Sequence, residues 1–282
     1  DIMYASSFYG RLMKSDLRMP KTAWGQKPHP DSIRTKDIFP KKADDEEVHR
    51  GEWLAFTMVS PHDNKTIYHG FQYLFESKDG GESWKRISDD LTYNDKSRMG
   101  KTPYAINHQA ITAIDESPLK KGLLYAGTDD GRVWMRPADG SAFVSIMKGI
   151  PQNAHTSRLV ASSHQENRVY LTLSNRREDD DKPYIYVSDD KGMTWRSIAA
   201  NLPPSPVNVI REDDKNPARL YCGTDMGIYY SNNGGKSWIS LQANLPATVS
   251  VQDLFIHPRE RNLVIATYGR GVYSLDDLGA LK

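Results

Sequence analysis

Short acidic turns are the part of this sequence whose residue types could do chemistry. Asp129 and Asp130 stand directly before Gly131, and Asp225 lies in a similar turn after a run of apolar residues. A glycoside hydrolase needs two carboxylates about 5–10 Å apart. Asp129 or Asp130, paired with Asp225, are therefore the catalytic candidates, provided that the turns meet. The alternative interpretation is that Asp-Gly and Asp-x-Gly are ordinary hairpin turns.

Charged and aromatic residues in the same kind of turn are candidates for ligand binding. Arg132, Glu178 and Arg270 bring charges that could hold polar groups of a ligand. Tyr268 brings a ring that could stack on a sugar or hold a peptide. The rings of Phe71, Tyr73 and Tyr104 could act in the same way. Convergence of such turns on one mouth would give a polar pocket rich in carboxylates.

The sequence predicts no metal site and no organic cofactor. It contains no His spacing typical of a metal site, no Gly-rich phosphate loop and no nucleophile elbow. Residues 175–182 form the most charged stretch, and its oxygens could hold Ca²⁺. This stretch lacks the fixed Gly and the closing Glu of a calcium loop, so a solvated loop is the preferred interpretation.

A recurring eight-residue pattern must position these turns. Ser-x-Asp-x-Gly-x-Ser/Thr-Trp occurs at 77–84, at 188–195 and, with Asn233 in the Asp place, at 231–238. Short Ser and Asp side chains accept hydrogen bonds from the N–H groups of a tight turn, and Gly supplies positive φ. The Trp then enters an extended strand. Each copy is therefore predicted to join two antiparallel strands, and the neutral Asn233 argues that the carboxylates of the pattern are structural.

The repeat extends on both sides of this pattern. Aliphatic residues stand three and seven positions after each Trp, and a decayed fourth copy has Phe143 in the Trp place. A self-repeat of this size, built of strands and turns, is typical of a β-propeller. We expect an all-β propeller of four-stranded blades, about six to seven in the ring. The expected repeats span 52–91, 108–150, 157–202, 206–245 and, without a fourth strand, 249–277.

The N-terminal part reads differently from the regular repeats. Residues 1–18 resemble the middle of a repeat whose first strand is missing, with strands at 2–6 and 11–14. Residues 19–50 are polar, contain prolines at 20, 28, 30 and 40, and predict a long surface excursion. We expect residues 1–282 to be a single propeller domain or part of one, with further blades or domains outside this chain.

The composition of the sequence limits the classes of protein to which the chain can belong. The formal net charge is +1, which gives no indication of nucleic acid binding. No apolar run is long enough to span a bilayer, and no signal peptide is recognisable. The single cysteine, Cys222, excludes an internal disulfide and is interpreted as a small core residue.

The repeated pattern resembles the Asp box, or BNR repeat, of sialidases, sortilin-type receptors and two-propeller xyloglucanases. The stretches 109–118, 127–134 and 267–277 resemble large secreted bacterial proteins of the sortilin-like or BNR type, which are labelled glycosyl hydrolases. The resemblance implies a β-propeller and an extracellular, cell-surface or periplasmic location. It implies function weakly, because Asp boxes lie on the rim of a blade, away from any central site.

Sialidases with this repeat hold the substrate carboxylate with three arginines. Arg158, Arg211 and Arg270 could be offered for that role, which makes Arg158 a further ligand-binding candidate. The spacing does not show that the three arginines meet, and the opening motif of sialidases is absent. Sialidase activity is therefore not expected.

The sequence favours a recognition or scaffold propeller of an exported bacterial protein. The expected ligand is a peptide, a protein segment or a polysaccharide bound at the axial mouth. The first alternative is a glycoside hydrolase that uses carboxylates of the mouth turns. The second alternative is a structural subunit of a larger surface assembly.

Overall fold

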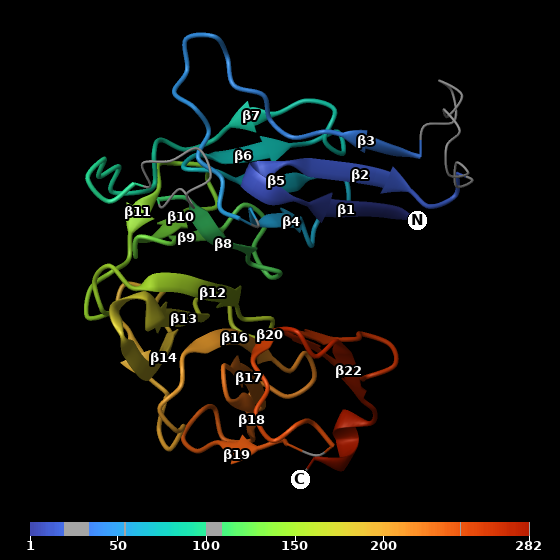
Figure 1. Ribbon diagram of the computed structural model, residues 1–282, viewed down its shortest axis with the longest axis vertical. Coiled ribbons are helices and arrows are strands. Elements are labelled where there is room, and N and C mark those ends of the chain that lie inside the picture. Colours follow the sequence, from blue (N-terminus) through green and yellow to red (C-terminus); the bar gives the residue numbers. More distant parts are fainter. Residues whose placement is uncertain (20–33, 54, 100–108, 243, 282) are drawn as a thin grey trace. The chain divides into compact units, whose positions relative to one another are not determined.

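The computed structural model describes residues 1–19, 34–53, 55–99, 109–242 and 244–281. The described residues form six antiparallel sheets whose strands follow chain order, and three short 3-10 turns are the only helical elements among them (Figure 1). The chain divides into two compact units, Asp1–Ile114 and Asp115–Lys282, with the boundary inside one strand. The six sheets are propeller blades, which confirms the predicted fold class.

The first unit contains two sheets. One sheet consists of β1 (Ile2–Ser6), β2 (Leu12–Asp16) and β3 (Thr35–Asp37). The other consists of β4 (Thr57–Val59), β5 (Ile67–Gly70), β6 (Leu74–Ser77) and β7 (Lys85–Arg86). The turn η1 (Phe8–Gly10) joins β1 to β2.

The second unit contains the last two residues of β8 and all the strands that follow it. Its first sheet is β8 (Ile111–Glu116), β9 (Leu124–Thr128), β10 (Val133–Arg136) and β11 (Val144–Ser145). The next is β12 (His155–Ala161), β13 (Val169–Asn175), β14 (Asp180–Ser188) and β15 (Arg196–Ser197), with η3 (Arg176–Glu178) between β13 and β14. Then follow β16 (Val207–Glu212), β17 (Leu220–Thr224), β18 (Gly227–Ser231) and β19 (Ile239–Ser240). The last sheet is β20 (Val251–Ile256), β21 (Leu263–Thr267) and β22 (Val272–Leu275), followed by η4 (Leu278–Ala280).

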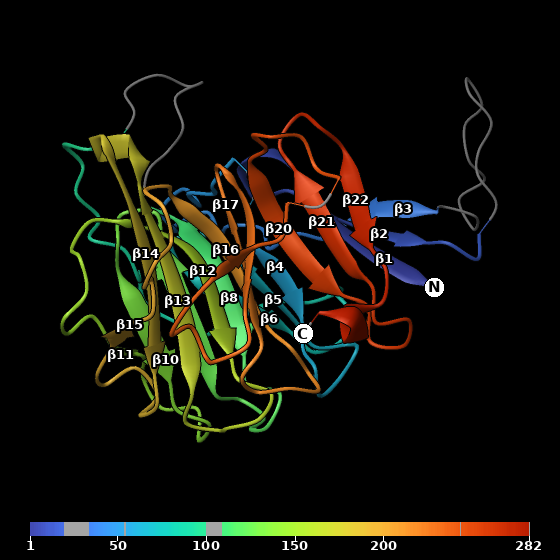
Figure 2. The same cartoon turned by 90° about the horizontal axis from the view of Figure 1, so that it is seen from below.

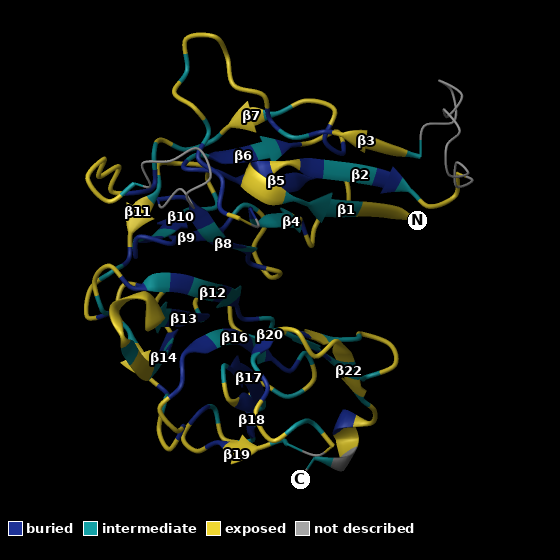
Figure 3. Cartoon of the chain, viewed as in Figure 1, coloured by how far each residue is buried: buried dark blue, intermediate teal, exposed yellow. Residues whose placement is uncertain are grey.

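Burial is graded across each four-stranded sheet. The second strands β9 and β17 are buried along their whole length, whereas the short fourth strands β7, β11, β15 and β19 are exposed (Figure 3). Within the second unit, the first strands of consecutive sheets contact one another, β12 with β16 and β16 with β20. Strands β12, β13 and β14 run side by side in Figure 2. The loops that follow the second strands of this unit therefore begin at strands that lie in a packed core.

The first sheet begins at the second strand of a blade, as the sequence predicted. The N–H of Ile38 donates to the carbonyl of Leu12, just as the N–H of Ile87 donates to that of Leu74. This match makes β1, β2 and β3 the second, third and fourth strands. The expectation of an unbroken polar excursion from residue 19 missed β3, because Thr35-Lys36-Asp37 is a short and polar strand. Residues 20–33 of that stretch lie outside the described residues.

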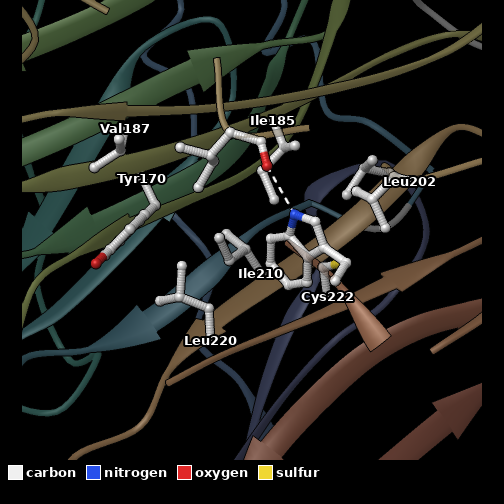
Figure 4. Packing of buried hydrophobic residues seen from close by; sticks show 10 residues of the cluster. Tyr170, Ile185, Val187, Leu202, Ile210, Leu220 and Cys222 are labelled. Carbon is white, nitrogen blue, oxygen red and sulfur yellow. Dashed lines mark hydrogen bonds between the residues drawn. The ribbon is translucent and has the colours of Figure 1, made fainter. Parts of the chain in front are cut away.

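Each box ties its blade to an isoleucine of the blade before it. Trp195 Nε1 donates to the carbonyl of Ile146 at 2.6 Å, and Trp238 Nε1 donates to that of Ile198 at 2.7 Å. Figure 4 shows the second of these bonds inside an apolar cluster that includes Leu202 and Cys222. A Trp in the box therefore supplies both buried area and the one donor that the preceding isoleucine carbonyl needs.

Glycine at the fifth position of the box permits this close approach. Gly235 has φ +82°, and a Cβ there would lie 2.8 Å from the Cβ of Ile198. Any side chain would therefore be strained both by the backbone conformation and by contact with a packed neighbour. The predicted turn function of the box is confirmed, and its packing function is added by the structure.

Candidate functional site

The connections between second and third strands form the candidate site of the second unit, and we call them the loop face. They comprise 129–132, 176–179, 225–226 and 268–271. A threonine ends three of the four second strands and closes the turn that follows. Thr224 Oγ1 donates to the carbonyl of Gly227 at 3.2 Å, and Thr267 Oγ1 donates to that of Gly271 at 2.6 Å. The Gly271 carbonyl also accepts from the N–H of Thr267, so the threonine hydroxyl adds a second hydrogen bond that closes the tight turn.

The hairpin of β13 and β14 connects two of the predicted catalytic carboxylates. Arg176 Nη1 lies 3.1 Å from Asp225 Oδ2, and Arg177 Nη1 lies 3.5 Å from Asp129 Oδ2. Adjacent arginines thus reach turns on both neighbouring sheets. The expected loop at 175–182 is shorter than predicted, because Asp180–Lys182 belong to β14.

Both carboxylates have little freedom. Asp225 Oδ1 accepts from Asn208 Nδ2 at 2.8 Å and from Ser250 Oγ at 2.7 Å, so both of its oxygens are engaged. The Asp129 side chain is fully buried, and Asp130 is also buried and accepts from the hydroxyl of Thr128. Such carboxylates are well placed to organise turns. A catalytic role for Asp129, Asp130 and Asp225 stays a prediction.

The predicted ligand-binding residues of the loop face differ in exposure. The Arg132 guanidinium stacks 4.2 Å above the ring of Trp134, and Glu178 is exposed. Tyr268 is 78% exposed, and Arg270 is exposed and makes no ion pair with any described residue. The N–H of Tyr268 donates to the carbonyl of Ser250 at 2.9 Å. Because the Ser250 hydroxyl donates to Asp225, this turn is linked to the same network.

A second cluster of charged residues lies on the first strands of the second unit. Arg158 Nη2 of β12 and Arg211 Nη2 of β16 lie 3.1 Å and 2.7 Å from Asp253 Oδ1 of β20. Arg211 Nε also donates to the carbonyl of Leu254 at 2.7 Å. Two of the three arginines considered for a ligand carboxylate therefore do meet, whereas Arg270 lies on the exposed β21–β22 turn.

Burial sets the protonation behaviour of this cluster. Desolvation raises the pKa of Asp115 to about 7, against the opposing effects of the Ala161 N–H, which donates at 2.6 Å, and of the two arginines. Desolvation and the nearby Arg211 charge lower the pKa of Arg158 to about 10. The cluster thus offers a carboxyl that titrates near neutrality beside a carboxylate held by two guanidinium groups, which is a charge arrangement that acid–base chemistry uses.

Sequence reasoning did not find Asp115 and Asp253 as candidates. Both lie within strands, where a polar residue on an alternating pattern is the ordinary solvent-facing residue. No turn chemistry or short motif marks them. Asp253 meets the arginines through the packing of β12, β16 and β20, and Asp115 of β8 meets β12 through the N–H of Ala161.

An exposed aromatic cluster in the first unit also escaped the sequence analysis. Phe8, Tyr9 and Trp53 are 49%, 41% and 44% exposed, and the ring centroids of Phe8 and Trp53 are 4.5 Å apart. The sequence had singled out Phe71 and Tyr73 instead. Phe71 is buried in the core, while Tyr73 is half-buried. Tyr104, also singled out, lies outside the described residues.

Burial raises the pKa of the Cys222 thiol, which confirms its interpretation as a core residue. No three His, Cys, Asp or Glu side chains of the described ranges gather as metal ligands. No helix in the described part of the chain is long and apolar enough to cross a membrane. The expectation that no cofactor is needed stays a prediction.

Comparisons with known proteins agree with the geometry. The family model "Sortilin-Vps10: Sortilin, neurotensin receptor 3" matches residues 183–277, about a third of the chain. No curated protein sequence matches the chain. The family-model match covers the boxes at 188–195 and 231–238 and the last sheet.

Solved structures share the fold at low identity. The GH74 xyloglucanase of Xanthomonas campestris has a TM-score of 0.68 at 15% identity, covering 98% of this chain and 43% of that chain. The structure of YCF48 bound to D1 peptide has a TM-score of 0.57 at 13% identity, covering 100% of this chain and 80% of that one. PorZ, a bacterial surface component of the type-IX secretion system of Porphyromonas gingivalis, has a TM-score of 0.58 at 16% identity, covering 98% and 38%.

These likenesses establish the fold alone. The chain spans less than half the length of the GH74 structures that it matches. The chain is therefore a β-propeller, and its residues 183–277 are similar to the sortilin family model.

Proposed function

We propose that this chain is a recognition propeller that binds an extended peptide or protein segment on the loop face. The observation that carries the proposal is the network from Asp129 through Arg177 and Arg176 to Asp225 and Ser250. It fixes the turns of neighbouring sheets relative to one another. A rigid, pre-organised surface lowers the entropic cost of binding.

The residues left exposed by this network suit a polypeptide ligand. Tyr268 is 78% exposed and Met226 is 48% exposed, while Arg270 and Glu178 add charges of both signs. Aromatic, Met and Arg residues are enriched in protein interfaces. The similar fold of YCF48 bound to D1 peptide supports the class of ligand, and the similar fold of PorZ supports an exported, surface-located protein.

Selection from a displayed library of random peptides tests the proposal. The wild-type chain is compared with a Tyr268→Ala/Arg270→Ala double variant and with a matched Leu119→Ala/Lys120→Ala control. Leu119 and Lys120 are also an exposed apolar and basic pair, but in the turn between β8 and β9, at the opposite end of β9 from the loop face. Enrichment of peptides on the wild type and the control, but not on the double variant, is expected. Retention of a polysaccharide panel instead of peptides would overturn the choice of ligand.

A glycoside hydrolase is the second candidate, and one observation favours it. Asp115 has a pKa raised to about 7 by burial and lies near the arginine pair that holds Asp253. Asp115 would act as the acid and Asp253 as the base or nucleophile. Release of reducing ends from xyloglucan or another polysaccharide, abolished by Asp115→Asn and by Asp253→Asn, would establish this activity in place of pure recognition.

A further inference from the structure

A cavity of about 100 Å³ lies beside β22, the last strand of the second unit. This volume is several times the about 10–15 Å³ that a single water molecule needs. The lining is mostly apolar and comes from β21, from β22 and from the segment after β19; it consists of Leu241, Asn244, Leu245, Ile265, Tyr273, Ser274 and Leu275. The described residues of this sheet include no fourth strand.

The internal repeat shows which residue type fills this position elsewhere. The N–H of Leu241 donates to Ile228 just as the N–H of Ile198 donates to Ile185, so Leu241 corresponds to Ile198. Ile198 is the residue whose carbonyl accepts from Trp238 Nε1. Leu241 therefore stands where the acceptor of a box tryptophan stands.

The other walls of the cavity match the surroundings of Trp238 in the same way. Ile265 pairs with Tyr273, as Cys222 pairs with Tyr229 in the preceding sheet. Cys222 belongs to the apolar cluster of Trp238 (Figure 4). Tyr229 packs against that cluster. The cavity is therefore the counterpart of the space that the Trp238 indole fills.

A polar residue supports the same assignment independently of the apolar walls. The side chain of Asn201 accepts from the N–H of Trp238 at 2.8 Å and donates to its carbonyl at 2.9 Å. Asn244 is the corresponding residue, since Asn201-Leu202-Pro203 recurs as Asn244-Leu245-Pro246. Asn244 lines the cavity, is exposed and makes no hydrogen bond with another described residue. It has the two groups needed to bracket the backbone of an incoming residue.

We propose that this cavity is a tryptophan socket. It binds the indole of a Ser/Thr-Trp segment of another polypeptide, which adds to the sheet as an outer strand along β22. Strand addition supplies main-chain hydrogen bonds, and a pocket for one side chain supplies specificity. Tyr273 and Ser274 would pair with the segment as Tyr229 and Tyr230 pair with β19.

Charge complementarity narrows the chemistry of the partner. Asp276 and Asp277 follow β22 and are exposed. The outer strands that follow Trp84 and Trp195 are basic, with Lys85-Arg86 and Arg196. The segment that fits is therefore extended. In it, Ser/Thr-Trp is followed directly by a basic residue, and an aliphatic residue stands three positions after the Trp.

The chain itself provides a probe for the experiment. A synthetic peptide with the sequence of Thr194–Leu202 is titrated into the protein by calorimetry, beside the same peptide with Trp195→Ala. We expect binding of the first peptide and binding weaker by at least about tenfold for the second. No binding of the first peptide, or equal binding of both, overturns the proposal.

Matched variants locate the binding. Asn244→Ala removes the bracket from the socket and is expected to weaken peptide binding by about tenfold. Asn201→Ala removes the equivalent bracket from Trp238 and is expected to lower thermal stability while leaving the affinity of the folded protein unchanged. Equal effects of both variants on affinity overturn the assignment. A concentration-dependent dimer that blocks the peptide also overturns it, because a second copy of this chain would then occupy the socket. The Tyr268→Ala/Arg270→Ala variant should bind this peptide normally, which separates failure here from failure of the loop-face proposal.

Discussion

At the scale of single residues, the carboxylate of the Asp box acts as a hydrogen-bond acceptor for its own turn. Asp79 accepts from the Ser77 hydroxyl at 2.8 Å, from the Glu82 N–H at 2.9 Å and from both N–H and hydroxyl of Ser83. These donors hold the pKa of Asp79 well below its usual range, with the Ser83 hydroxyl contributing most. Asn233 fills the same place with one acceptor oxygen and an amide that donates to Ser237 at 2.8 Å.

Replacing Asp79 by Asn should therefore change the pH dependence of stability. A depressed folded-state pKa contributes stability that is present above the unfolded pKa of about 3.9 and is lost as the pH falls through the folded pKa. Asp79→Asn should unfold within a few degrees of the wild type at pH 7 and should lose less stability than the wild type below pH 4. Thermal unfolding followed by circular dichroism from pH 3 to pH 7 measures both effects. Parallel pH profiles for the two proteins would contradict this account of the box.

The pKa of Asp115 is shifted in the opposite direction to that of Asp79, so its effect on the pH dependence of stability has the opposite sign. Its folded-state pKa, raised to about 7 by desolvation, lies above the unfolded value, so the unfolded chain loses this proton first. The folded state is then penalised progressively between about pH 4 and pH 7, and the penalty is complete above pH 7. Asp115→Asn should be more stable than the wild type at pH 8, and this difference should shrink towards zero at pH 4, as measured by urea denaturation. A difference that grows on acidification would show that the carboxylate is stabilised in the folded state.

At the scale of elements, the box tryptophan joins sheets rather than strands. Trp238 is 4% exposed and gives its indole N–H to the Ile198 carbonyl. Trp238→Phe keeps a ring but leaves that carbonyl without its donor and should cost about 1–3 kcal/mol of unfolding free energy. Trp53→Phe is the control, since Trp53 is 44% exposed and should cost well below 1 kcal/mol. Equal losses in the two variants would show that the indole N–H of Trp238 does not contribute to the free energy of unfolding.

The elements were also the level at which sequence reasoning worked best. The three boxes predicted the turn between two antiparallel strands, because Ser, Asp, Gly and Trp each satisfy a separate local requirement of that turn. Their fixed spacing in the chain predicted the repeated four-stranded blade. Strand β3 was missed because its three residues are polar and exposed, so that neither alternation nor β-propensity marks it. The packing of Trp238 against Ile198 was not predictable, since it depends on contact between consecutive sheets.

At the scale of the whole chain, the sequence located loops but could not say what they do. Asp129 and Asp225 do meet a common hairpin, yet through Arg177 and Arg176, which no pattern pairs with them. The convergence of Arg158 and Arg211 on Asp253 joins residues that are 95 and 42 positions apart from it in the chain (253 − 158 and 253 − 211). Long-range pairings of this kind follow from how sheets pack, and one sequence carries no direct record of that packing.

The measurement that tests the proposed function most directly is the equilibrium affinity of a library-selected peptide for three proteins. These are the wild type, the Tyr268→Ala/Arg270→Ala variant and the Leu119→Ala/Lys120→Ala control, compared by fluorescence polarisation at one salt concentration. The account predicts that the first double variant binds at least about tenfold more weakly than the wild type and that the control binds equally well. The same affinity for all three proteins would contradict recognition on the loop face.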